Sequence, residues 1–395
     1  MDGARTRGQP AAIGAVEVMV RGPVPHAVLF VGPDGVGKTT LALDLAAGLL
    51  CTADPGARPC RACRACRMVD KGGHPDLHRL APAGPGRQVV IGGPGARYRG
   101  VRELIGELTL LPAEGGARVA IIEGADRMNE DAQSALLKTL EEPPAGVVIV
   151  LCADQEDRLL PTVRSRCARV RLGLVGARDI EAIVADHDLA DPPLAARLGR
   201  LAGGRPGIAL AYARAPDAVL IRAELSRVLL DLTGAGAAAR LAAVRAAIPH
   251  ALALSAAMTA GETPAAPRPG RRGAAPSAPP PVAQEEPAES PDDAPEGKSR
   301  PVPATERRRA AEILVGLWMD VARDLSLAGS GGGRSVRDTV MLEELAEVAS
   351  ALVPGSAARF LERAGRSAEL LASNVSPELI LDALALAWPH RSAAA

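Results

Sequence analysis

The chain has 395 residues, too many for one ordinary hydrophobic core, so we expect two or three domains. Hydrophobic residues make up 47%, whereas aromatic residues make up only 2%, which argues against single-strand binding by base stacking. Lys plus Arg and Asp plus Glu both total 46, so the formal net charge is zero. A protein that holds DNA by itself usually has a basic excess. Any DNA contact is therefore expected to be local or shared with other chains.

No apolar run reaches the roughly 18 uninterrupted residues of a membrane span, and the polar stretch 1–9 lacks an apolar signal core. These features predict a cytoplasmic protein without membrane contact. Disulfides are uncommon in that compartment. Four of the six cysteines crowd into residues 51–66, which indicates a metal site.

The first half of the chain alternates strand-like and helix-like stretches. Residues 27–31 read as a buried strand, followed by a glycine-rich turn and a helical run over 39–50. Further short apolar runs cover 119–122 and 147–151, which suits strands of a covered parallel sheet. Asn129 is a suitable cap for a helix that stops at Pro143-Pro144. This alternation predicts an α/β doubly wound domain.

The second half is helical in pattern and is interrupted once. From Pro264 to Pro303 the chain holds 12 of its 34 prolines and no Leu, Ile or aromatic residue, so we expect disorder there. The fold class is therefore α/β plus all-α. The predicted domains are a nucleotide-binding α/β domain at 1–172, a small helical lid at 173–217, and a helical collar at 218–390 interrupted by the Pro-rich segment 261–305.

A phosphate-binding loop lies between the first strand and the first helix. Its residues fit G-x-x-x-x-G-K-[ST] without a mismatch, and backbone N–H groups freed by the glycines can surround phosphate oxygens. Lys38 supplies a charge to the outer phosphates, and Thr39 can ligate Mg²⁺. We therefore predict ATP and Mg²⁺ binding, against the plain alternative of a glycine-rich turn. The predicted site comprises Gly32, Pro33, Asp34, Gly35, Val36, Gly37, Lys38, Thr39, Thr40 and Glu123.

Hydrolysis needs more than this loop. An NTPase requires an acidic residue at the end of a neighbouring strand for Mg²⁺, and usually a base for the attacking water. Glu123 is the candidate for the first role, but the next position, where a base is common, is Gly124. Asp126 is two residues further on and should point elsewhere. A missing base costs about 10²- to 10⁴-fold in rate, so we expect weak or absent ATPase activity.

The cysteine module combines Cys60, Cys63 and Cys66 with Cys51 at the end of the first helix. Four thiolates suit a closed tetrahedral zinc site with a structural role. An iron–sulfur cluster is the main alternative, but the ferredoxin run requires a fourth cysteine where this chain has Asp70. Unligated core cysteines are the third interpretation.

Taken together, these motifs resemble the AAA+ clamp-loader subunits of bacterial DNA polymerase III. The resemblance rests on the phosphate loop, the four cysteines, the stretch from Asn129 to Pro144, and the run Leu160 to Cys167, over about residues 8–215. It implies a hetero-pentamer with gamma/tau and delta subunits that places a sliding clamp on primed DNA. It also implies that Arg166, in Ser165-Arg166-Cys167, acts as an arginine finger in a neighbour's ATP site. The bland interpretation of Arg166 is a surface arginine.

Within this family the sequence is more similar to the delta-prime type than to the gamma/tau motors. Motor subunits resemble Asp-Glu where this chain has Glu123-Gly124, and they carry a lid arginine where Pro206 stands, with Arg205 one step away. Three hypotheses stay open beside the delta-prime reading: a gamma/tau-type motor, an autonomous P-loop ATPase, and a zinc-dependent nucleic-acid binder with a decayed loop.

Overall fold

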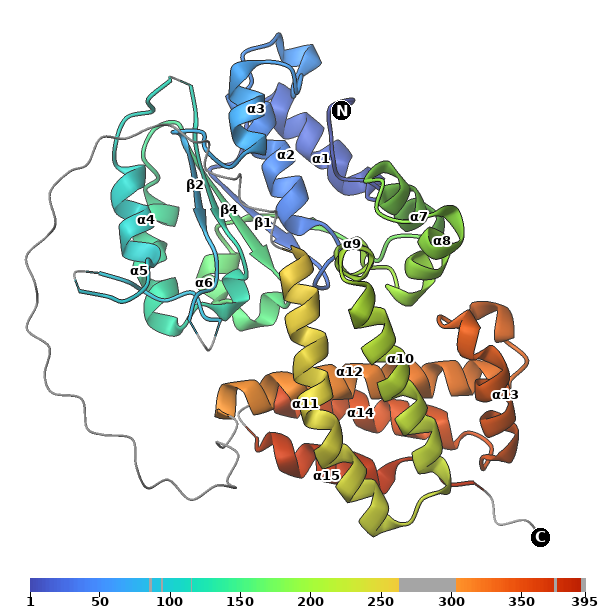
Figure 1. Ribbon diagram of the computed structural model, residues 1–395. Helices are drawn as coiled ribbons and strands as arrows, with labels where there is room; N and C mark the ends of the chain where they lie inside the picture. The colour runs from blue at the N-terminus through green and yellow to red at the C-terminus, as the bar shows by residue number, and fades with distance from the viewer. Residues whose placement is uncertain (85–86, 94, 115, 263–302, 373–374, 392–395) are drawn as a thin grey trace, which may run out of the picture.

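The computed structural model describes residues 1–84, 87–93, 95–114, 116–262, 303–372 and 375–391 (Figure 1). The N-terminal part is built on a five-stranded sheet with the strand order β2-β3-β4-β1-β5. All pairings are parallel, and β1 aligns Val28 with Val150 of β4 and Ala168 of β5. The strands are β1 (Ala27–Val31), β2 (Leu77–Leu80), β3 (Arg118–Ile122), β4 (Val147–Ala153) and β5 (Ala168–Arg171).

Helices cover both faces of this sheet, and the alternation of side chains along β1 shows why. Val28 and Phe30 belong to the core on one face, whereas Ala27 and Leu29 belong to the core on the other. The first face carries α1 (Pro10–Arg21), α2 (Lys38–Leu50) and α3 (Arg64–Asp70); the second carries α4 (Val101–Leu108), α5 (Glu130–Glu141) and α6 (Pro161–Arg164).

The predicted start and end of α5 are confirmed. The Asn129 side chain accepts a hydrogen bond from the Ala132 backbone N–H at 3.0 Å, and the helix ends at Glu141, before Pro143-Pro144. This cap satisfies one of the N–H groups that a helix start leaves unpaired. The α/β fold predicted for the first half is confirmed as well.

The remainder contains helices and no named strand in its described residues, which completes the predicted α/β plus all-α fold class. One apolar core runs from Val175 to Trp388, so the segments predicted as lid and collar share a core. The helices are α7 (Ala177–Asp186), α8 (Pro192–Leu201), α9 (Pro206–Arg214), α10 (Pro216–Asp231), α11 (Ala237–Glu262), α12 (Ala304–Gly329), α13 (Leu342–Ala351), α14 (Ser356–Ala372) and α15 (Pro377–Ala387).

Packing in this helical part centres on three aromatic rings and one buried cation. The ring centroids of Phe360 and Trp388 lie 4.6 Å apart, and Trp318 lies 6.3 Å from both. The fully buried Arg240 donates to the backbone oxygens of Trp388 at 2.6 Å and Pro389 at 3.0 Å. An arginine at this place satisfies carbonyls that the end of α15 leaves without an intrahelical partner.

Within α11, the stretch Ala237–Thr259 is long and apolar enough to cross a membrane by length and composition. It contains Arg240 and Arg245 and packs against α9, α10, α12 and α15. Only 22% of its most apolar 18-residue window is buried among the described residues. The prediction of disorder over Pro264–Pro303 falls on residues of which all but Pro303 lie outside the described part of the chain.

Candidate functional site

The phosphate loop connects the end of β1 to the start of α2, as its mechanism requires. Gly35 and Gly37 have φ values of 76° and 101°, a left-handed region that glycine adopts without strain. A Cβ on Gly32 would lie 2.3 Å from the backbone oxygen of Leu172, so only glycine fits there. The loop therefore has the backbone geometry that lets N–H groups surround an anion, with the N-terminus of α2 beside it.

Lys38 is buried in this loop and already bonded. Its Nζ donates to the backbone oxygens of Gly32 at 2.7 Å and Pro33 at 2.8 Å, and it forms an ion pair with Asp154 Oδ1 at 2.7 Å. Asp154 follows β4, the strand beside β1. Sequence reasoning missed Asp154, because only the strand order brings the end of β4 next to the loop.

Glu123, the predicted Mg²⁺ residue, follows β3. The expectation that its strand neighbours β1 is wrong, because β4 lies between them. The Glu123 carboxylate accepts from Arg79 Nη2 at 2.6 Å and from Arg79 Nε at 3.1 Å, so an arginine of β2 holds it. Asp126 is buried, which raises its pKa, and its Oδ1 accepts from the Asp154 backbone N–H at 3.1 Å.

Gly124 occupies a position that disfavours a side chain. Its φ is 58°, and a Cβ there would lie 2.8 Å from Pro82 Cγ and 3.3 Å from Arg127 Cδ. Beside Glu123 the chain thus offers no base, and the local backbone is shaped for glycine.

The segment predicted as a lid contacts the phosphate loop through the start of α9. The Gly207 backbone N–H donates to the Gly35 oxygen at 2.8 Å, and Pro206 is buried in the first turn of the helix. Arg205, which precedes α9, places its Cβ 3.5 Å from where a Cβ on Gly35 would lie. The start of α9 thus lies directly against the loop between β1 and α2.

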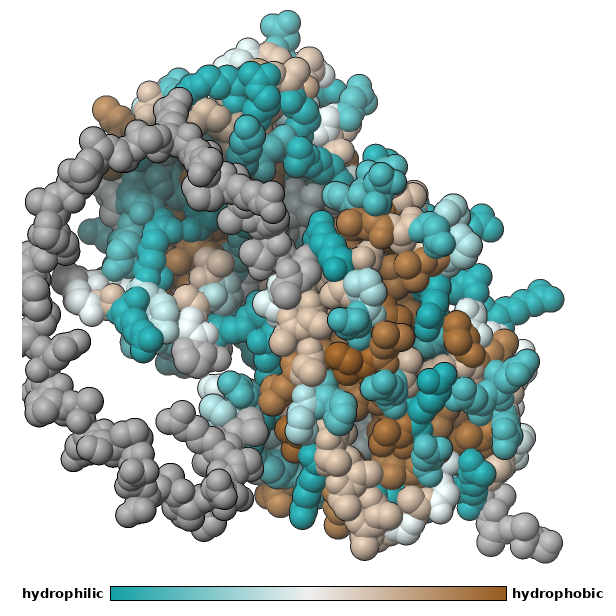
Figure 2. Space-filling model, in the orientation of Figure 1, coloured by the Kyte–Doolittle hydropathy of each residue, from teal (hydrophilic) through white to brown (hydrophobic). Residues whose placement is uncertain are grey.

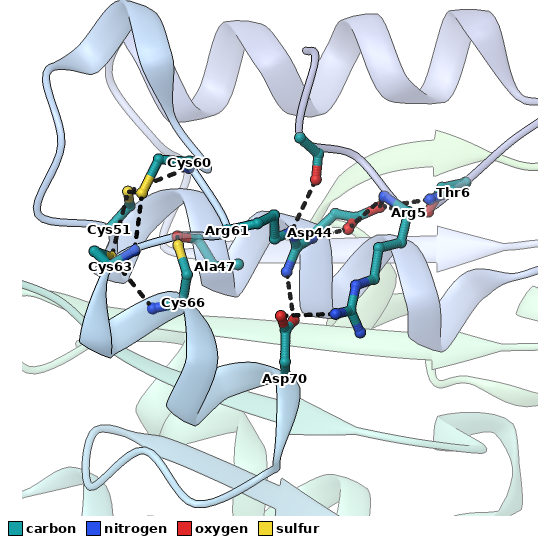
Figure 3. Close-up of polar contacts among 11 residues, drawn as sticks. Arg5, Thr6, Asp44, Ala47, Cys51, Cys60, Arg61, Cys63, Cys66 and Asp70 are labelled. Carbon is teal, nitrogen blue, oxygen red and sulfur yellow. Dashed lines mark hydrogen bonds and ion pairs between the residues drawn. The ribbon is translucent and has the colours of Figure 1, made fainter.

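The four cysteines of the predicted metal module lie together. Cys51 caps the end of α2, Cys63 caps the start of α3, and the sulfur atoms of Cys51, Cys60, Cys63 and Cys66 all lie within 4.8 Å of one another (Figure 3). Four close thiol donors fit a tetrahedral Zn²⁺ better than a hard cation, which prefers oxygen ligands.

Backbone N–H groups point at these sulfurs and favour their charged form. Burial alone would raise the pKa of the Cys63 thiol, but N–H groups led by that of Cys66 lower it to about 6. Hydrogen bonds from the Cys63 and Ala62 backbones lower the pKa of Cys60. Burial raises the pKa of Cys66, whose thiolate would therefore depend on a bound cation.

A buried carboxylate that sequence reasoning missed ties this module to α2. Asp44 is fully buried and accepts from the Thr6 backbone N–H at 2.9 Å, from Thr6 Oγ1 at 2.7 Å, and from the Arg5 N–H at 3.0 Å. It also pairs with Arg61, which in turn pairs with Asp70 at 2.7 Å (Figure 3). The signal was present, because a charged residue stood among the apolar residues of a buried helix.

Arg166, the predicted arginine finger, precedes β5. Its guanidinium pairs with Glu141 Oε1 at 2.6 Å and donates to the Thr162 oxygen at 2.9 Å, with 34% of the side chain exposed. β5 and β1 run parallel, and Ala168 aligns with Val28, so Arg166 lies beyond the amino end of β5. The phosphate loop lies beyond the carboxyl end of β1. A strand rises about 3.3 Å per residue, so Gly32 lies roughly 13 Å along the strand direction from the level of Val28 and Ala168. Arg166 lies further from the loop than that level, so it cannot serve its own loop.

Comparison with known proteins places this part of the chain. Residues 10–175 match the family described as DNA polymerase III, delta subunit. This match covers the α/β part of the chain and less than half of its full length. The resemblance recognised from the motifs is confirmed over this segment.

Curated relatives agree with this family. The chain is 39% identical over 183 residues to the DNA polymerase III delta-prime subunit of Pseudomonas aeruginosa, covering 46% of this chain and 53% of that protein. It is 36% identical over 173 residues to the delta-prime subunit of Bacillus subtilis, covering 44% and 49%. It is 33% identical over 181 residues to the tau subunit of Escherichia coli, covering 45% and 27%. The chain thus spans about half the length of the delta-prime relatives it matches.

Among solved structures, a DNA polymerase III gamma subunit-related protein from Thermotoga maritima covers 95% of this chain and 99% of its own at 14% identity. Its TM-score is 0.38, too loose an overlap to add to the family assignment.

Proposed function

We propose that this chain is a delta-prime-type clamp-loader subunit of DNA polymerase III. It would assemble in the cytoplasm with gamma/tau and delta subunits into a hetero-pentamer that places a sliding clamp on primed DNA. The observation that carries the proposal is the position of Arg166, in a domain of this family, at the end of the sheet remote from its own phosphate loop. This distance from its own loop supports a role for Arg166 in another chain's site.

In such an assembly Arg166 would act as an arginine finger, stabilising charge that develops on a phosphate held by a neighbour. The ion pair with Glu141 is half exposed, so it is weak enough to be exchanged for a phosphate oxygen. The planar guanidinium can offer two parallel N–H donors to that oxyanion, which a lysine cannot do.

The chain's own site would bind ATP with Mg²⁺ and hydrolyse it poorly. The loop from Gly32 to Thr39 and the adjacent Thr40 would hold the nucleotide, and Glu123 would stand near the metal. The supporting geometry is the pair of left-handed glycines and the buried Lys38. Weak hydrolysis follows from Gly124, which offers no base, and from Arg79, which engages the Glu123 carboxylate.

The cysteine module would hold one structural Zn²⁺ through Cys51, Cys60, Cys63 and Cys66. A closed four-thiolate site leaves no position for substrate, so its contribution is to the fold. It fixes the end of α2 to the start of α3, which helps hold the helix that begins at the phosphate loop.

We further propose that residues 1–172 form the nucleotide-binding domain, 173–217 the lid and 218–390 the collar through which subunits associate. Apolar side chains gather over α10 on the face shown in Figure 2, and Leu220 and Val228 of that helix are 63% and 37% exposed. Contiguous exposed apolar surface commonly marks an interface between proteins.

Reconstitution tests the proposal. The chain, mixed with gamma/tau and delta subunits, should co-elute in one stoichiometric complex, and its omission should abolish clamp loading on primed DNA. A gamma/tau-type motor is the second candidate, favoured by the 33% identity to the tau subunit of Escherichia coli. ATP turnover by the isolated chain at about 1 s⁻¹ or more would support the motor instead. A chain that stays alone and active would support an autonomous ATPase.

A further inference from the structure

The ammonium group of Lys38 has no N–H donor left over for a phosphate oxygen. Its side chain is 8% exposed, and its three acceptors are two loop carbonyls and Asp154 Oδ1, at 2.7, 2.8 and 2.7 Å. An ammonium group has three N–H donors, so all of them are used. A phosphate oxygen can bind Lys38 only by replacing one of these acceptors.

Of the three acceptors, only Asp154 is negatively charged, as a phosphate is. It therefore competes with a phosphate for the positive charge of Lys38 as well as for a hydrogen-bond position. The two carbonyls belong to the loop itself and are neutral, whereas Asp154 presents a carboxylate, 25% exposed, from the neighbouring strand. Its backbone N–H is held by Asp126 Oδ1 at 3.1 Å, and its Oδ2 lies 3.6 Å from Arg127 Nη2. Asp154 is thus fixed in position before any ligand arrives.

We propose that Asp154 determines which nucleotide this site accepts, by holding Lys38 and repelling a terminal phosphate. The inference rests on the proposed nucleotide binding and specifies it. A γ-phosphate adds negative charge where the Asp154 carboxylate already lies against the lysine, and like charges at such separations repel strongly in a partly buried site. A nucleoside diphosphate needs less of Lys38. The site therefore binds a nucleoside diphosphate at least as tightly as a triphosphate.

Asp154→Asn tests this directly, because it removes the charge and keeps the shape. Kd values are measured by titrating the full chain with ADP and with a non-hydrolysable ATP analogue, each with and without Mg²⁺. Hydrogen bonds to charged groups are worth about 1.5–3 kcal/mol, so the variant should bind the ATP analogue on the order of 10- to 100-fold more tightly. Its gain for ADP should be smaller.

Three further variants make the result unambiguous. Asp157→Asn removes a nearby charge whose side chain is 94% exposed, and it should leave both Kd values unchanged. Lys38→Ala should abolish binding of both nucleotides. Asp154→Ala, with melting temperatures for all variants, replaces Asp154→Asn if that variant does not fold.

The outcomes separate the inference from the proposal beneath it. If wild type binds nucleotide, Lys38→Ala does not, and Asp154→Asn binds the ATP analogue no more tightly than wild type, the inference fails and the nucleotide site stands. Weaker binding by Asp154→Asn only with Mg²⁺ would make Asp154 a metal-shell residue and overturn the inference. Binding by none of the variants, wild type included, would overturn the nucleotide site itself.

Discussion

Replacing Asp44 with Asn should destabilise the α/β domain although Asp44 touches neither nucleotide nor a cysteine. The carboxylate is fully buried and accepts hydrogen bonds from Arg5, Thr6 and Arg61. Asn offers one acceptor oxygen and turns an NH₂ group toward these donors. The variant therefore leaves the Arg61 guanidinium and two backbone N–H groups without a charged partner.

Breaking a buried ion pair by removing one partner costs about 3–5 kcal/mol. Arg61 is 17% exposed, so water can partly replace the lost partner, and the lower end, about 3 kcal/mol, is the expected loss. For a domain of 150–250 residues each kcal/mol shifts the melting temperature by about 2–4 °C. The domain should therefore melt about 6–12 °C lower.

Calorimetry or circular dichroism on the full chain measures this shift. Asp70→Asn is the matched control, because Asp70 also pairs with Arg5 and Arg61 but accepts only from these two arginine side chains, which water can reach in part. Its loss of stability should be smaller than that of Asp44→Asn, since no backbone N–H group loses its acceptor. Zinc content should fall in parallel for Asp44→Asn, since Arg61 lies between Cys60 and Cys63. Equal melting shifts for the two variants would refute the reasoning.

Three further predictions concern the metal, hydrolysis and the Pro-rich segment. Elemental analysis should find one zinc per chain, lost in Cys63→Ala and kept in Cys152→Ala, because Cys152 is a buried residue of the sheet core; iron, or an absorbance band near 400 nm, would contradict the assignment. Gly124→Glu should not restore ATPase activity and should destabilise the chain by about 1 kcal/mol or more. The reason is that the left-handed φ at this position and the contact with Pro82 both disfavour a side chain. Turnover at about 1 s⁻¹ or faster in this variant would show that only the missing base limits hydrolysis. Deleting residues 264–303 should leave assembly unchanged on size-exclusion chromatography, and loss of the complex would show that the segment is more than a linker.

Features with local signals could be predicted from the sequence. The residues of the phosphate loop are consecutive in the sequence, so its glycines and Lys38 predict the turn between strand and helix that the structure contains. The Asn129 cap and the end of α5 before Pro143 are fixed within one helix. The cysteines were found because their spacing is short and Cys51 ends the preceding helix.

Features set by the order of strands could not be predicted. Asp154 contacts Lys38 only because β4 pairs with β1, and the sequence near residue 154 does not predict this pairing. Because β4 lies between β3 and β1, Glu123 is one strand further from the phosphate loop than expected, and its carboxylate is bound by Arg79. The hydrogen bonds of Asp44 could not be predicted either, because they form only when the N-terminal residues fold back over α2. Its charge within an apolar helix did indicate that it needs a partner.

The most direct test of the account compares Arg166→Ala with Glu141→Gln in the reconstituted complex. Both variants break the same ion pair. Its partners are partly exposed, so the pair contributes about 0–1 kcal/mol to the stability of the fold, and both isolated chains should melt near wild type. Only Arg166→Ala removes the proposed finger, which can be worth about 10³- to 10⁵-fold at one site and less across a ring with several sites. DNA-dependent ATPase and clamp loading should fall in Arg166→Ala and persist in Glu141→Gln. Full activity of a stoichiometric Arg166→Ala complex would contradict the central claim.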